Sequence, residues 1–298
     1  MTGQHTRKQY ESYNQARKFF LDNHEKLIAL EMYFMTVLQD FISSCGTELQ
    51  RDYNEASYLF PFWQNYPPDE RGRSPKGDQF PWIEVGEHVF GPKLSRFLAA
   101  RFSISDPGLP TGPDERYLLR DEHILKITKT TKAAWLFVDI KSVGPRDDQD
   151  HTVLSHNQIS GDGKWNKIKT GIENAPMLAV GARASHKFYA AIPPIYVLSD
   201  GTIAPVIHII IKPVYAMLEL NETKQTTGQP LSRITLACIP NGLLLTEKPN
   251  YLREYPGLLF PGKDDKDKNP QKMRARVSFA KIRSIAEWRM RDFTFGIN

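Results

Sequence analysis

The chain has 298 residues, of which 40% are hydrophobic and 24% are charged, a composition that excludes a disordered protein and allows a substantial core. Its formal net charge of +5 and its isoelectric point near 9.0 are compatible with nucleic-acid binding, but they are also common in proteins that bind none. The two cysteines, Cys45 and Cys238, lie far apart in the sequence, which argues against a disulfide framework and against a zinc site.

The N-terminal part is predicted to be helical. Residues 8–22 and 24–44 have helical spacing, and the second segment carries an apolar stripe. The stripe consists of Leu27, Leu30, Phe34, Val37, Leu38 and Phe41. It indicates packing in the core or between subunits, so residues 1–50 are a possible dimerisation region. Residues 1–18 are polar and no apolar run approaches the length of a membrane span, so we expect a cytoplasmic protein without a membrane partner.

The remainder of the chain has an α/β pattern. We expect loops at 53–82, a short helix around 83–89 that ends before the Gly91-Pro92 step, and a late helix at 279–290. Strands are expected near 117–128, 134–141, 195–198, 203–211 and 234–239. His208 interrupts the apolar run 203–211 and is expected to be a core residue, not a ligand. No linker divides the sequence, so we expect a single domain over residues 1–298.

The tripeptide Asp139-Ile140-Lys141 follows the apolar run Trp135-Leu136-Phe137-Val138, and a second carboxylate, Asp114, lies upstream in a Pro113-Asp114 step. Residues two apart on a strand project from the same face of a sheet, so Asp139 and Lys141 are expected to point the same way. A carboxylate can hold Mg²⁺, and an ammonium beside it can stand where a phosphate and its attacking water meet.

An acidic residue two before a lysine is weak evidence taken alone, because a chain of this size contains such tripeptides by chance. Asp162-Gly163-Lys164, Glu222-Thr223-Lys224 and Asp264-Asp265-Lys266 have the same pattern, but each lies in a polar or Gly-containing stretch that is typical of loops. Only Asp139 follows a predicted buried strand. The alternative is an ordinary ion pair at a strand end, with unrelated loop carboxylates nearby.

Basic residues are concentrated late in the chain. Residues 262–289 contain nine lysines and arginines against four acidic residues, a difference that equals the net charge of +5 of the whole chain. Such a run can simply be a solvated surface. The alternation in Arg274-Ala275-Arg276-Val277 favours instead a β-ribbon that carries two arginines on one face.

Other enzyme classes lack their motifs. The sequence has no phosphate-binding Gly-x-x-x-x-Gly-Lys-Ser/Thr loop, no Gly-x-Ser-x-Gly elbow and no His-Glu-x-x-His. Ser155-His156-Asn157 matches one fragment of a His-Asn-His nuclease site, but no second histidine accompanies it in a strand-turn-helix context.

Several blocks of the sequence, in order along most of the chain, resemble the BglI-like type II restriction endonucleases of the Pro-Asp…(Asp/Glu)-x-Lys nuclease superfamily. The blocks are PFWQNYPP (61–68), PKGDQFPWIEVGE (75–87), LPTGPDERYLL (109–119), FVDIKSVGPRD (137–147), LSDGTIAPV (198–206), IKPVYAM (211–217) and PGKDD (261–265). The first fifty residues and the extreme C-terminus are more divergent. The resemblance implies a restriction-endonuclease-like core, in which helices flank a central mixed β-sheet.

The resemblance also implies catalytic roles. Asp114 and Asp139, together with the backbone carbonyl of Ile140, would hold one or two Mg²⁺ ions, and Lys141 would orient the attacking water. An upstream helix often adds a glutamate to the site in this superfamily, and Glu84 and Glu87 are the candidates here.

Roles in DNA binding follow from the same resemblance. The residues expected to read base edges are Asp147, Lys263, Asp265, Arg274 and Arg276. The expected phosphate contacts are Arg71, Arg73, Lys76 and Arg146, with surface salt bridges as the alternative. The implied partner is double-stranded DNA, bound by a homodimer that reads GCC half-sites around an unread spacer.

Two other function classes stay open. One is a structure-specific DNA-repair nuclease of the same superfamily, which would share Asp114, Asp139 and Lys141 but cut by DNA shape. The other is a DNA-binding protein without catalysis, against which the intact Asp139 and Lys141 argue.

Overall fold

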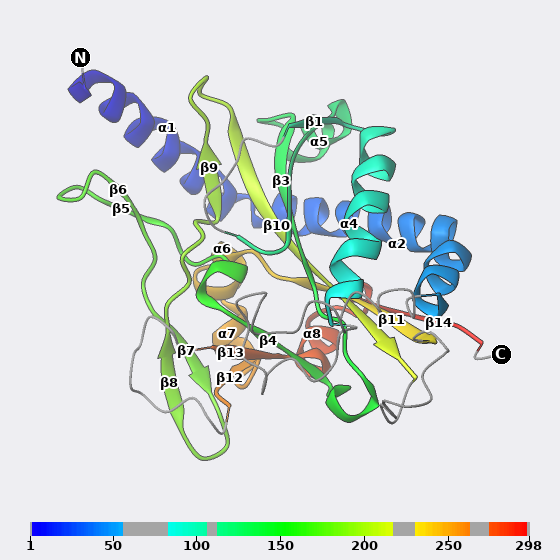
Figure 1. Cartoon of the computed structure of the whole chain (residues 1–298). Helices are drawn as coiled ribbons and strands as arrows, with labels where there is room; N and C mark the ends of the chain where they lie inside the picture. Colours follow the sequence, from blue (N-terminus) through cyan, green and yellow to red (C-terminus); the bar gives the residue numbers. More distant parts are fainter. Residues whose placement is uncertain (1, 56–82, 106–111, 217–229, 263–273, 297–298) are drawn as a thin grey trace, which may run out of the picture.

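A mixed β-sheet forms the centre of the protein in a computed structural model that describes residues 2–55, 83–105, 112–216, 230–262 and 274–296 (Figure 1). Its strand order is β1-β2-β3-β10-β11-β14, and β9 pairs with one end of β10. The strands are β1 (Ser103–Ser105), β2 (Glu115–Arg120), β3 (Ala133–Ile140), β9 (Ile195–Val197), β10 (Ile203–Tyr215), β11 (Leu231–Ile239) and β14 (Met290–Thr294). β3 and β10 are parallel, and the other pairings are antiparallel, so the sheet is mixed as expected.

Helices pack around this sheet, and Figure 1 shows α2 lying across β3 and β10. The helices are α1 (Thr2–Asp22), α2 (His24–Asn54), α4 (Ile83–Ala99), α5 (Glu122–Thr128), α6 (Gly242–Thr246), α7 (Tyr251–Glu254) and α8 (Phe279–Ile285). Short 3₁₀ turns in the described residues are η2 (Pro145–Asp147), η3 (His156–Gln158) and η5 (Glu287–Arg289). The resulting arrangement is the predicted α/β core with flanking helices.

Smaller sheets extend the molecule beyond the central one. β4 (His151–Leu154) pairs with β13 (Ala275–Ser278), which also pairs with β12 (Leu259–Phe260). Two hairpins are formed by β5 (Lys164–Asn166) with β6 (Gly171–Glu173), and by β7 (Met177–Val180) with β8 (Ser185–Phe188). β4 is the next strand after β3 along the chain, so the β4–β13 pair is joined directly to the end of β3.

The two faces of the central sheet differ in character. Leu136, Val138 and Ile140 of β3 belong to one buried cluster with the α2 stripe and with α4. The alternate residues of β3 point to the opposite face, where Trp135 and Phe137 pack edge to face with ring centroids 5.6 Å apart. On that second face, the residue after Phe137 in the same alternation is Asp139.

The N-terminal prediction is confirmed and extended. The second helix continues to Asn54, ten residues past the predicted end, and every residue of its predicted apolar stripe is buried in the protein. α2 is long and apolar enough to cross a membrane by length and composition alone, but its buried residues pack on the sheet. A fully buried ion pair between Glu31 and Arg289, at 2.6 Å, also ties α2 to η5. The stripe is therefore core packing, and any dimer contact of residues 1–50 must use other faces.

Two predicted boundaries are wrong in the first half of the chain. Gly91-Pro92 does not end a helix, because α4 runs through Pro92 to Ala99 while Phe90, Leu94 and Leu98 bury one side of it. This packing outweighs the lost backbone hydrogen bond of proline. The predicted strand 117–128 ends at Arg120, because the Asp121 side chain accepts the N–H of His123 at 3.0 Å and caps α5.

The C-terminal prediction is wrong in the same way. The predicted helix at 279–290 ends at Ile285, and the chain turns through η5 into the edge strand β14, which no sequence pattern indicated.

The central strand β10 is longer than predicted, because it continues past Ile211 through Lys212 and Pro213 to Tyr215. His208 is buried at 2% exposure against Phe137, as expected of a core residue.

Candidate active site

Asp139 and Lys141 lie where β3 ends, on the same face as predicted. Asp139 is 1% exposed, and the Lys141 ammonium lies 3.0 Å from each of its two carboxylate oxygens. The Lys141 backbone N–H donates to the Ile211 carbonyl at 2.8 Å, so the pairing with β10 continues past the last strand residue. The backbone therefore fixes both side chains relative to the sheet.

Asp114 reaches the same place from the neighbouring strand. β2 and β3 are antiparallel with Glu115 opposite Val138, so one further step sets Asp114 opposite Asp139. An oxygen of Asp114 accepts the N–H of Ile140 at 2.6 Å, although Asp114 itself is exposed. Two carboxylates that are distant in the sequence are thus brought together by strand register, which the sequence pattern alone could not demonstrate.

The residues present suit a hard divalent cation. Carboxylate oxygens and a backbone carbonyl are the ligands that Mg²⁺ prefers, and Asp114 and Asp139 supply two of them at one sheet end. Within the described part of the chain no group of three or more His, Cys, Asp or Glu side chains forms a metal cluster. The backbone carbonyl of Ile140 as a further ligand stays a prediction.

The predicted glutamates cannot be assigned from these residues. Glu84 and Glu87 fall on the first turns of α4, but their side chains lie outside what the structure describes.

Gln158, on η3, contacts the site and was missed by the sequence analysis. Its side-chain amide donates to an Asp139 oxygen, while its carbonyl oxygen accepts the Ser155 N–H at 2.8 Å in a capping box. The preceding residue, Asn157, donates from its side-chain amide to the backbone carbonyl of Gly112 at 3.3 Å, and Gly112 lies two residues before Asp114. η3 therefore contacts both the segment that carries Asp139 and the segment that carries Asp114. The signal was available as the Ser155-x-x-Gln158 spacing, which the sequence analysis interpreted only as a fragment of a His-Asn-His motif.

One of the competing acidic-x-lysine tripeptides is described, and it is structural. Asp162 is buried, accepts the Ala175 N–H at 2.7 Å and pairs with Lys164 at 3.2 Å. Lys164 also pairs with Glu247 at 3.2 Å. The other two tripeptides, at 222–224 and 264–266, lie outside the described residues.

The predicted base-reading residues that are described lie on two connected elements. Asp147 is exposed on η2, which follows β3 along the chain. Arg276 is on β13, while Arg274 is exposed just before it. Ala275 and Val277 are fully buried on the other side, so the predicted alternation is confirmed. Because β13 pairs with β4, the chain leads from Lys141 through η2 directly to the ribbon.

The remaining predicted DNA contacts lie outside the part of the chain that the structure describes. They are Arg71, Arg73, Lys76, Lys263 and Asp265, together with the side chain of Arg146.

Comparisons with known proteins point to one family. The family model described as restriction endonuclease BglI matches residues 8–293. A type II restriction enzyme BglI from Bacillus subtilis is 48% identical over 286 residues, which cover 94% of this chain and 95% of that protein. The crystal structure of the restriction endonuclease BglI bound to its DNA recognition sequence superposes with a TM-score of 0.87 at 46% identity, covering 99% of each chain.

A more distant structure shares the fold alone. Tetrameric restriction endonuclease SfiI bound to cognate DNA matches with a TM-score of 0.61 and 12% identity, over 92% of this chain and 86% of that one.

Proposed function

The chain belongs to the BglI restriction endonuclease family, and from that membership we propose that it is a type II restriction endonuclease acting on double-stranded DNA. The proposed target is an interrupted GC-rich palindrome with GCC half-sites around an unread spacer. The observation that carries the proposal is the Asp139–Lys141 pair, which stands with Asp114 at one sheet end within a fold matched by a DNA-bound enzyme.

The proposed reaction is in-line attack of water on a phosphodiester bond. Asp114 and Asp139 would hold one or two Mg²⁺ ions, and bound Mg²⁺ supplies an acidified water and neutralises phosphoryl charge. Lys141 lies beside Asp139, so its ammonium is available to orient that water and to stabilise charge on the phosphoryl oxygens. Gln158 would keep the Asp139 carboxylate fixed by donating to one of its oxygens.

Sequence reading is assigned to the two elements that follow the catalytic strand. Asp147 can accept from a cytosine amino group, and Arg274 and Arg276 can donate to guanine edges in the major groove. Lys263 and Asp265 would extend the same reading segment. We assign Arg71, Arg73, Lys76 and Arg146 to phosphate contacts, which fix register without carrying sequence information.

A homodimer and a cytoplasmic location complete the proposal. A palindromic site presents the same half-site on each strand, so a two-fold symmetric dimer can apply the same reading surface twice.

Digestion of phage DNA by purified protein tests the proposal. With Mg²⁺ we expect discrete fragments that map to one sequence, while Lys141→Ala should cut roughly 10²-fold more slowly and still bind the mapped site in Ca²⁺. A smear would favour a nuclease that does not read sequence, and cutting confined to branched DNA would favour the repair class. Intact DNA under all metal conditions would favour a non-catalytic binding protein.

A further inference from the structure

A second lysine lies beside the proposed catalytic lysine. Ile211 of β10 pairs with Ile140 of β3, so the next residues, Lys212 and Lys141, are neighbours on the same face of the sheet. Lys212 is only 2% exposed. Its ammonium donates to the Gln149 carbonyl and lies 3.0 Å from an Asp148 oxygen. The catalytic strand's neighbour therefore holds the segment that follows η2.

A second cation holds the same carboxylate. One guanidinium nitrogen of Arg233 on β11, Nη2, donates to both oxygens of Asp148 at 2.7 Å, while its Nε donates to the Thr235 hydroxyl at 3.2 Å and fixes the orientation of the guanidinium group. Burial opposes ionisation of Asp148, but the hydrogen bonds from Lys212 and Arg233 outweigh it and lower the pKa of the carboxyl group. Asp148 is thus a permanently charged anchor near neutral pH.

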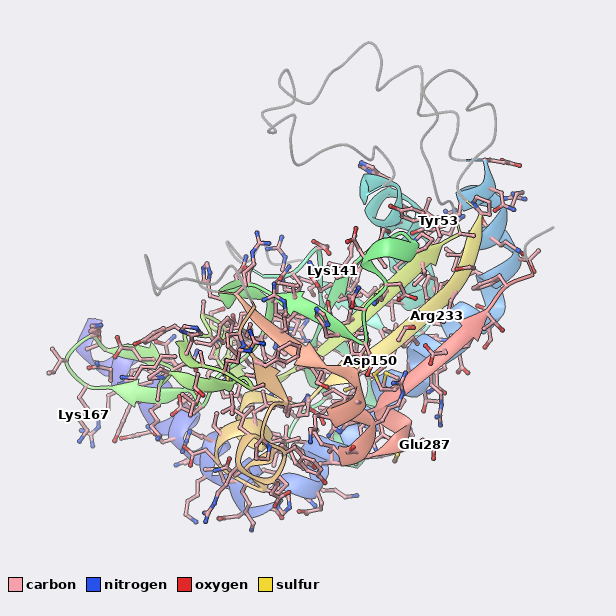
Figure 2. The ribbon with its side chains drawn as sticks, turned by 90° about the horizontal axis from the view of Figure 1, so that it is seen from below. Tyr53, Lys141, Asp150, Lys167, Arg233 and Glu287 are labelled. Atoms are coloured by element: carbon pink, nitrogen blue, oxygen red, sulfur yellow. The ribbon has the colours of Figure 1, made fainter. Side chains whose placement is uncertain are left out.

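The anchored segment is also fixed at its far end. Asp150 accepts the N–H of Ala280 at 3.2 Å, at the start of α8, and pairs with Arg283 at 3.1 Å. Figure 2 labels Asp150, Arg233 and Lys141, which lie in one region of the molecule. We call residues 148–150, with Lys212 and Arg233, the linker clamp.

The linker clamp lies between the proposed catalytic residues at the end of β3 and the proposed base-reading residues on η2 and β13. Residues 142–150 join the end of β3 to β4, and they include η2 with Asp147. β4 in turn pairs with β13, with Val153 opposite Arg276. The segment that joins Lys141 to the ribbon is therefore the segment that Lys212 and Arg233 hold through Asp148.

Stability alone does not account for the buried Lys212 ammonium. Burying an ion pair seldom stabilises a protein more than apolar side chains of the same volume, because both charges lose water. We propose that Lys212 and Arg233 are positioning residues for sequence specificity. They hold Asp148 so that Asp139 and Lys141 are aligned only when both reading elements fit their bases. This inference rests on the proposed function.

The test compares rates on two DNAs with Lys212→Met, Asp148→Asn and their double variant. The substrates are the site mapped by wild-type digestion and the same duplex with one altered base pair, cut under single-turnover conditions with Mg²⁺. We expect the rate ratio between the two DNAs to fall about tenfold in each single variant. The double variant should fall no further, because both changes break one clamp.

The ratio is chosen because a merely destabilised protein lowers both rates in parallel and leaves it unchanged. Lys18→Met removes an equivalent amine from the exposed Lys18–Asp22 pair on α1 and should keep the wild-type ratio. Arg274→Ala, at a proposed reading position, should lower it. If Lys212→Met does not fold, Arg233→Met removes the other cation from Asp148 and leaves Lys212 in place, and the same fall is expected.

An unchanged ratio in folded clamp variants would overturn the inference, as would independent, multiplying effects in the double variant. Failure of the proposed function looks different, since wild-type protein would then give no discrete fragments, and the clamp inference would fall with it.

Discussion

The two faces of the central sheet are formed by the same strands but carry different kinds of side chain. On one face Leu136, Val138 and Ile140 continue into Ile209 and Ile211 of β10, and α2 and α4 cover them. On the other face the apolar residues stop partway along each strand, and charged side chains follow. In chain order, the residues on this face are Trp135, Phe137, Asp139 and Lys141 on β3 and just after it, and Val206, His208, Ile210 and Lys212 on β10.

Residues that contribute only to packing therefore lie on one face of the sheet, and the residues proposed for catalysis lie on the other. The helix-covered face is closed, so its residues can only pack. The opposite face is closed at one end and polar at the other, and there the first charged residues are buried and held by partners that come from distant segments. We expect substitutions at the polar end of the second face to change activity, and substitutions on the helix-covered face and at the apolar end of the second face to change stability.

The largest effect is expected at the polar end of the second face. Asp139→Asn keeps the shape of the side chain but removes the charge that a hard cation needs, so Mg²⁺-dependent cleavage should fall by more than about 10³-fold. Single-turnover cleavage of a mapped site measures the loss, and thermal unfolding checks that the fold is kept. Efficient cutting by this variant at ordinary Mg²⁺ concentrations would remove Asp139 from the metal site.

The helix-covered face should respond in the opposite way. Leu236 of β11 is fully buried there, opposite Ile211, so Leu236→Ala leaves a cavity and should lower the free energy of unfolding by about 3 kcal/mol. The cleavage rate per folded molecule should stay near that of the wild type. Denaturant titration and an active-site count measure the two quantities, and a tenfold loss of rate without a loss of stability would contradict the separation.

A smaller effect is expected at Gln158, which acts through Asp139. Gln158→Leu removes the donor to the carboxylate and also the capping-box acceptor, so we expect cleavage to slow about tenfold and the Mg²⁺ concentration for half-maximal rate to rise. Gln158→Glu keeps the acceptor for Ser155 but replaces the donor to Asp139 with a negatively charged oxygen, so a loss of rate in both variants assigns the effect to the contact with Asp139 and not to the capping box. Equal metal dependence in wild type and both variants would show that the contact does not tune the site.

Local signals predicted part of this site. Asp139 and Lys141 are two residues apart, so strand periodicity alone set them on one face. The role of Asp114 needed in addition the register of β2 on β3, which no local pattern specifies. Gln158 reaches Asp139 across nineteen positions in the sequence, and a hydrogen bond of that kind follows only from the fold.

Lys212 shows why the strand prediction stopped short. The apolar run was expected to end at Ile211, because a lysine is a poor candidate for the inside of a sheet. β10 continues because Asp148 and the Gln149 carbonyl, from the segment after η2, receive the buried ammonium. The edge strand β14 also has a polar residue with a tertiary partner, because Asp292 accepts a hydrogen bond from the Thr235 hydroxyl on the neighbouring strand β11. These compensating partners are tertiary, and the local sequence contains no sign of them.

The smallest predicted effect concerns His208, the polar residue in the apolar part of the second face. Burial lowers its pKa to about 3, and within the described residues its Nε2 has no hydrogen-bond partner. An unfolded histidine takes up a proton near pH 6.5, so between that pH and about 3 the unfolded chain binds a proton that the folded chain refuses. The stability is therefore fully present above pH 6.5 and is lost as the pH falls.

His208→Leu removes this proton uptake while keeping a side chain of similar volume against Phe137. We expect the wild type to lose about 1 kcal/mol more than the variant between pH 7 and pH 5.5, where few carboxylates titrate. Denaturant unfolding at several pH values measures the difference, and the activity of folded protein at pH 7.5 should be nearly the same for both. Parallel stability curves would mean that the folded protein takes up a proton on His208 as readily as the unfolded chain does, and that burial does not lower the pKa of this side chain.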